Sequence, residues 1–199
     1  MEERTSTPDQ GAATAPPPTG TTPVPGYRRM GHPRVSGSVV GAVGGCAFIV
    51  VNTPALDGPW ALGLRLLGLA ALGLWVWAVL LRPRPLPPHP RPDRTGGIVY
   101  FGGLIAMFAI MFIGIRWLEA AGREGLEPAV VALAVGAHFL PYARAFAAPI
   151  FLWLGSVMVA LGIAGLALGL TSTVVAAPAA AVAAGFVLLI GSAVDALGV

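Results

Sequence analysis

The sequence predicts an all-α membrane protein, a polytopic six-helix transmembrane bundle with the N-terminus and the C-terminus both cytoplasmic. Of its 199 residues, 56% are hydrophobic and only 11% are charged, whereas soluble domains carry about 25% charged residues. The apolar residues form long runs with few or no charges, as helices that span a bilayer do. The arginines gather at alternate ends of these runs. Together these observations exclude an ordinary soluble domain.

The first 34 residues differ from the rest of the chain. They are rich in Thr, Pro, Gly and charge, and they contain seven prolines. Such a segment buries too little apolar surface to offset the chain entropy that folding would cost. We therefore expect residues 1–34 to be a disordered cytoplasmic tail and residues 35–199 to form the membrane domain.

The first three helices follow from apolar runs and from the segments that interrupt them. The run 35–53 carries no charge and is long enough to cross the bilayer with its flanks. A second helix is expected at 60–81, with Arg65 as its one internal charge. It ends at residues 82–94, where six prolines favour an extended connection. A third helix is expected at 96–118.

The second half of the chain holds three more expected helices. The fourth, at 128–146, has only sixteen uncharged positions before Arg144 and begins with a proline, which suits the first helical turn. Residues 145–194 then carry no formal charge. As a single helix they would be about 75 Å long, more than twice the thickness of the hydrocarbon layer. The chain must therefore turn once, at the polar break 171–173, which gives helices at 148–170 and 174–195.

The orientation follows from the arginines, because cytoplasmic loops carry an excess of basic residues. With the N-terminus inside, the outer segments hold only Arg116 and Arg123. All twelve basic residues are Arg, and the chain is rich in Ala, Gly and Pro, as in high-GC bacteria. We therefore expect a multi-pass protein of a bacterial inner (plasma) membrane. The nine arginines expected in the cytoplasm are Arg4, Arg28, Arg29, Arg34, Arg82, Arg84, Arg91, Arg94 and Arg144.

The fourth expected helix contains the main candidate site. His138 lies within this span, and an ionisable residue inside a membrane is costly and is therefore a functional candidate. Pro141 cannot donate to the carbonyl of Ala137, and Tyr142 shares the helical face of His138. These groups could bind a small polar ligand or pass a proton. The alternative is a neutral histidine that only packs and hydrogen-bonds between helices.

Arg65 is the second candidate for ligand binding. It is expected near the outer end of its helix, within reach of the loop between the third and fourth helices. With Arg116, Glu119 and Glu127 it would form an outer cluster of charges. Such a cluster is either a vestibule for an anion or an ion-pair network that ties helix ends together.

The run around His138 resembles a signature of small, uncharacterised bacterial multi-helix membrane proteins, Gly-x-His-Phe-x-Pro-x-Ala-(Arg/Lys)-x-Phe. The resemblance supports the multi-helix architecture and the choice of His138, and it implies no activity. The matching positions are Gly136, His138, Phe139, Pro141, Ala143, Arg144 and Phe146.

These features favour a non-enzymatic structural or partner-binding membrane protein. The alternative is a small-molecule or proton-linked transporter or ligand sensor that uses His138. We expect no catalytic residues, no metal site and no cofactor, since the single cysteine, Cys46, excludes cysteine-cluster metal sites and no acid–base pair is evident.

The expected partners are the lipid bilayer and other membrane helices, and no nucleic acid is expected. The Arg/Pro segment 82–94 either contacts anionic lipid head groups or is only a topology signal. Stripes of small residues at helical spacing allow close helix association, within the chain or with a second copy or another subunit. These stripes are Gly37, Gly41 and Gly45, and Gly165 and Gly169.

Overall fold

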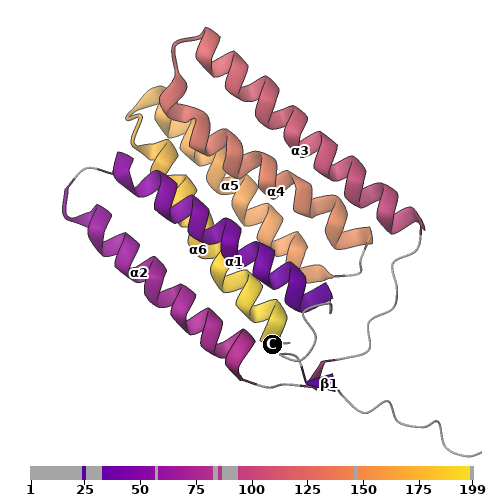
Figure 1. Cartoon of the computed structure of the whole chain (residues 1–199). Coiled ribbons are helices and arrows are strands. Elements are labelled where there is room, and N and C mark those ends of the chain that lie inside the picture. The colour runs from indigo at the N-terminus through magenta and orange to yellow at the C-terminus, as the bar shows by residue number, and fades with distance from the viewer. Residues whose placement is uncertain are drawn as a thin grey trace, which may run out of the picture.

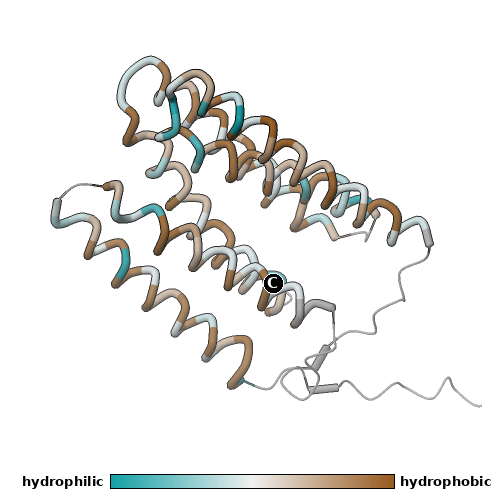
Figure 2. Tube along the Cα trace, turned by 45° about the horizontal axis from the view of Figure 1, so that its top comes forward, coloured by the Kyte–Doolittle hydropathy of each residue, from teal (hydrophilic) through white to brown (hydrophobic). Residues whose placement is uncertain are grey.

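Six long helices form a single bundle in the computed structural model of the chain (Figure 1). All six are long and apolar enough to cross a membrane, so the expected multi-pass helical fold is confirmed within the described part of the chain. Apolar colours run along all six helices in Figure 2. The structure describes residues 24–25, 33–56, 58–82, 85–86, 94–145 and 148–197.

The helix boundaries lie within two residues of those expected from the sequence. Short 3-10 helices precede α2 and α4, namely η2 (Thr53–Ala55) and η4 (Glu124–Leu126), and a π-helical segment, η3 (Val76–Leu81), prolongs α2. The long helices are α1 (Pro33–Asn52), α2 (Trp60–Trp75), α3 (Arg94–Ala120), α4 (Glu127–Ala145), α5 (Pro149–Thr171) and α6 (Ala176–Leu197).

The turn after α3 has a clear local cause. Gly122 adopts a positive φ of 65°, which glycine tolerates without strain. Its amide donates a hydrogen bond to the carbonyl of Glu119 at 3.0 Å. The amide of Arg123 donates to the carbonyl of Leu118 at 2.8 Å. This pair of bonds is the Schellman arrangement that ends many helices. It allows α4 to return directly along α3.

The helices are not arranged in sequence order. Helix α1 packs mainly on α6, α4 mainly on α5, and α5 on α6, so these four form the centre. Helix α2 packs on α1 and α6 at one edge, and α3 packs on α4 at the other (Figure 1). The most apolar window of α3 has 0% of its residues buried, against 39% for α4 and 44% for α6. Consecutive helices α2 and α3 therefore lie at opposite edges of the bundle.

Glycines hold the two central pairs at close distance. A Cβ atom added to Gly45 would lie 2.6 Å from the carbonyl oxygen of Gly185 on α6, and the reverse distance is also 2.6 Å. Gly136 on α4 and Gly155 on α5 oppose each other in the same way, at 2.9 and 2.7 Å. Small residues permit such backbone contact between membrane helices.

The predicted small-residue stripes therefore serve contacts within the chain. Gly41, like Gly45, faces α6, where an added Cβ would lie 2.9 Å from the Cβ of Ser192. Gly165 faces α4 and α6, and Gly169 faces the side chain of Leu126 in η4. Gly37 is the exception, since nothing in the described structure lies within 4 Å of the place that a Cβ atom would occupy there.

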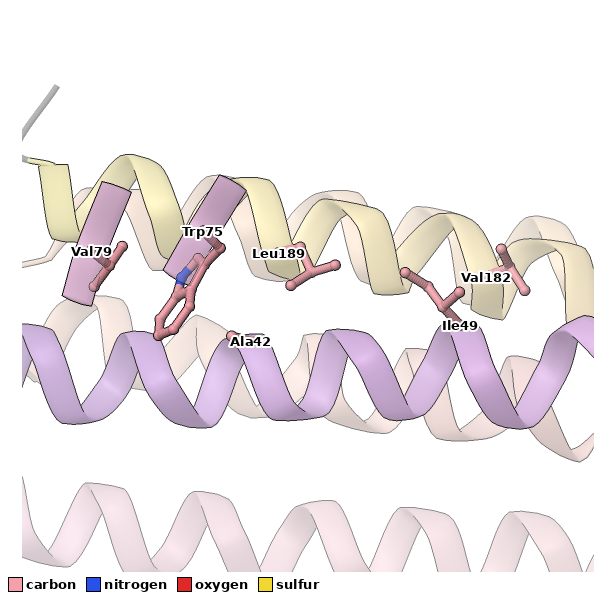
Figure 3. Close-up of a cluster of buried hydrophobic side chains, with 6 residues drawn as sticks. All are labelled: Ala42, Ile49, Trp75, Val79, Val182 and Leu189. Carbon is pink, nitrogen blue, oxygen red and sulfur yellow. The ribbon is translucent and has the colours of Figure 1, made fainter. Parts of the chain in front are cut away.

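One buried cluster joins α1, α2 and α6 (Figure 3). A chain of hydrogen bonds runs beside it, because Trp75 Nε1 donates to Ser38 Oγ at 3.1 Å and Ser38 Oγ donates to the Ser192 carbonyl at 2.7 Å. These bonds satisfy polar atoms that would be costly to bury alone. The apolar members of the cluster are Ala42, Ile49, Trp75, Val79, Val182 and Leu189.

Two residues of the N-terminal tail contact the proline-rich segment. Strand β1 (Val24–Pro25) pairs antiparallel with β2 (Pro85–Leu86), with Val24 opposite Leu86. The sequence did not predict this pairing. Most of the tail expected to be disordered, and most of the segment 82–94 expected to meet anionic lipid, lie outside the described residues.

Candidate functional site

His138 lies in the seam between α3 and α4. Its imidazole faces Gly103 of α3, where an added Cβ would lie 3.0 Å from Nδ1. The missing side chain at Gly103 therefore makes room for the ring. The Nδ1 atom is buried and has no hydrogen-bond partner of ordinary geometry among the described residues. His138 thus faces protein, as expected, and its ring lies against the backbone of Gly103.

Aromatic rings from α3 and α4 contact the imidazole, and a ring from α5 packs behind them. The ring of Tyr100 on α3 lies edge-on to His138, with centroids 6.0 Å apart. On α4, the centroids of Phe139 and Tyr142 lie 5.7 and 6.3 Å from that of His138. Phe151 on α5 packs edge-on against Tyr142 at 4.9 Å. We call His138, Tyr100, Tyr142 and Phe151 the aromatic seam.

Tyr100 and Phe151 are the members that sequence reasoning missed. Both lie on other helices than His138, and the sequence does not show which faces of two helices contact each other. The His138–Tyr142 pair was predicted from the spacing of four residues along one helix. The structure brings these two residues together as expected.

Two further polar features adjoin the aromatic seam. Pro141 lies inside α4 and has no N–H for the carbonyl of Ala137, which leaves an acceptor one residue before His138. Asp195 on α6 is close enough to Tyr142 to act electrostatically on its hydroxyl, as is Tyr100. Polar groups from α3, α4 and α6 therefore meet at the end of the bundle where α1 begins and α6 ends.

Arg65 does not belong to this site. It lies on α2, at the opposite edge of the bundle from α3 (Figure 1). Its Nε donates to Thr53 Oγ1 in η2 at 2.8 Å. Arg65, the second candidate for ligand binding, therefore lies in a different place from His138 and Tyr142.

The outer ion-pair network is also smaller than expected. Arg116 and Glu119 on α3 form an ion pair at 2.7 Å, with both side chains well exposed to solvent or lipid. Within the described residues, neither Arg65 nor Glu127 joins this pair. The separation of α2 from α3 explains why Arg65 does not reach the pair. An exposed pair one helical turn apart contributes little stability, about 0.3–0.5 kcal/mol.

The described residues contain no group of three or more His, Cys, Asp and Glu side chains that could hold a metal ion. Cys46 lies half-buried on α1 among apolar neighbours of the α1–α2–α6 cluster. Comparisons with protein families, curated proteins and solved structures find no match for this chain. The function must therefore be argued from the aromatic seam itself.

Proposed function

We propose that this protein is a non-enzymatic, multi-pass protein of a bacterial inner membrane, and that it senses a proton or a small polar ligand at the aromatic seam. One observation carries the proposal. The Nδ1 atom of His138 is buried beside the backbone of Gly103, and no described residue makes a hydrogen bond of ordinary geometry with it. Nearly all buried polar atoms in proteins are paired, so an exception needs an explanation.

A small hydroxyl-bearing or amide-bearing ligand would pair with this nitrogen, and a proton taken up there would make it a donor, for which the backbone of Gly103 is the nearby partner. Histidine is suited to the role, because its ordinary pKa lies close to physiological pH and each ring nitrogen can donate or accept. The phenols of Tyr100 and Tyr142, and the Ala137 carbonyl to which Pro141 cannot donate, supply further donors and acceptors nearby. The close packing of rings favours a ligand of very few atoms.

A sensor is favoured over a transporter by the order of the helices. An inverted repeat of three helices, common in transporters, would place α2 and α5 in equivalent positions. Here α2 lies at an edge and α5 in the centre. In contrast, α3 packs mainly on α4, so a change at His138 acts on the contact that holds α3 in place.

The arginine distribution supports the orientation that we propose, with both termini in the cytoplasm. The aromatic seam would then lie toward the cytoplasmic side. The rival proposal is a structural or partner-binding protein in which His138 only packs. In that case the seam would bind nothing and its histidine would not titrate.

The test is thermal stability in detergent between about pH 5 and 8. The chain has two other histidines, His32 and His89, which must not contribute to the signal. Both are therefore first replaced by Gln, which leaves His138 as the sole histidine. We expect the melting temperature of this variant to depend on pH, and we expect the dependence to vanish when His138→Gln is added. Identical pH profiles of the two variants, with no change in melting temperature on addition of small amides or alcohols, would refute the sensor and leave the structural role.

A further inference from the structure

Arg65 presents a cation at a lipid-facing edge of the bundle. It is exposed on α2, beside the exposed apolar side chains of Leu62, Leu66 and Leu69. Among the described residues its guanidinium has one partner, the neutral hydroxyl of Thr53. A charge near the hydrocarbon layer without a counter-ion is costly. An anion from outside the described protein would remove this cost.

The depth of Arg65 suits a phosphate group. Trp60 begins α2 and is 76% exposed, and tryptophan prefers the interface between lipid and water. Arg65 lies five residues further along the helix, about 7.5 Å deeper. A long side chain that extends toward the interface from that depth reaches the level of the lipid head groups.

Thr53 fixes the direction of the guanidinium. The threonine is fully buried in η2, so its hydroxyl cannot move far. Because Nε is held by this hydroxyl at 2.8 Å, the two terminal nitrogens are left to bind another group. Paired N–H donors of this kind match two oxygens of a phosphate.

We propose that Arg65, held by Thr53, binds the phosphate of a phospholipid head group at the end of the bundle where α1 joins α2. This site lies at the opposite edge from the aromatic seam and does not depend on it. The competing anion within the chain is Asp57, which precedes α2 in the sequence and lies outside the described residues.

The experiment measures retention of phosphatidylglycerol by the purified full chain with native mass spectrometry. Arg65→Gln removes the charge, and Thr53→Val removes the hydroxyl while keeping the shape of the side chain. Arg123→Gln is the matched control, because Arg123 is exposed in the turn after α3, at the same end of the bundle. A phosphate-free glycolipid serves as the control lipid. Melting temperatures establish that each variant is folded.

We expect Arg65→Gln to weaken phosphatidylglycerol binding about five-fold, since an arginine at the membrane surface contributes about that factor. Thr53→Val should weaken binding less. Binding of phosphatidylglycerol by Arg123→Gln and binding of the glycolipid should be unchanged.

Equal retention of phosphatidylglycerol by the wild type and Arg65→Gln would overturn the proposal. So would displacement of the lipid by an excess of inorganic phosphate, which would indicate a site for free anions. If Arg65→Gln and Asp57→Asn lose the same stability and lipid retention is unchanged, Asp57 is the partner of Arg65. That result would also overturn the phospholipid proposal.

Discussion

The contact between Gly45 and Gly185 gives the sharpest prediction about packing. Replacement of Gly45 by Ala adds one methyl group between α1 and α6. That group would lie 2.6 Å from the Gly185 carbonyl oxygen, 3.0 Å from Leu189 Cγ and 3.2 Å from the Leu189 amide nitrogen. Two of these three atoms belong to the backbone and cannot rotate away. The helices themselves must separate.

The size of the effect follows from these distances. Ordinary contacts of a Cβ atom begin near 3.4 Å, so the shortest contact must lengthen by roughly 0.8 Å. Overpacking of a close-packed interior costs about 1–3 kcal/mol. The gain from replacing a helical glycine by alanine is about 0.5–1 kcal/mol. The difference between these terms is about 0–2.5 kcal/mol, and we expect Gly45→Ala to lower the free energy of unfolding by about 1 kcal/mol.

Gly37→Ala is the matched control, because Gly37 lies on the same stripe of α1 with nothing in the described structure within 4 Å of an added Cβ. This variant should be neutral or more stable by up to about 1 kcal/mol. The free energy of unfolding can be measured for both by titration with a denaturing detergent in mixed micelles. Equal stability of the two variants would refute the close packing of α1 against α6.

Two further predictions concern the ends of the chain. A reporter that is active only outside the cytoplasm should be silent when fused at Val199, because the arginine distribution orients both termini inward; activity there would contradict this topology. Deletion of residues 2–22 should leave the melting temperature unchanged. Deletion of residues 2–26 also removes the β1–β2 pair and should lower the melting temperature only slightly, because an isolated two-stranded pair is marginally stable. A large loss of folded protein in the first deletion would refute the expectation that the tail does not pack.

The sequence was sufficient to predict the helices, because the length of each apolar run and its flanking charges or prolines set the boundaries. The segment 60–81 illustrates this, since its limits match α2 with η3. His138 was identified for the same kind of reason. An ionisable side chain stands out in an apolar run, whatever its neighbours are in space.

Which helices lie side by side in the bundle could not be predicted from the sequence. The wrong placement of Arg65 follows from that. Arg65 was expected beside Glu119 and Glu127 because all three approach the same end of the bundle. The structure instead places α2 at one edge and α3 at the other. Tyr100 and Phe151 were missed because contacts between helices depend on rotation and order, which apolar runs without a clear polar face do not encode.

On the proposed function, His138 takes up a proton or a small polar ligand in the aromatic seam. The most direct measurement is nuclear magnetic resonance of histidine labelled with nitrogen-15 in the full chain, with the His138 signals assigned from the His138→Gln variant. We predict that both ring nitrogens of His138 change shift between about pH 5 and 8, as a titrating imidazole does. A His138 spectrum that stays constant across this range, and that is also unaltered by small amide or alcohol ligands, would contradict the claim.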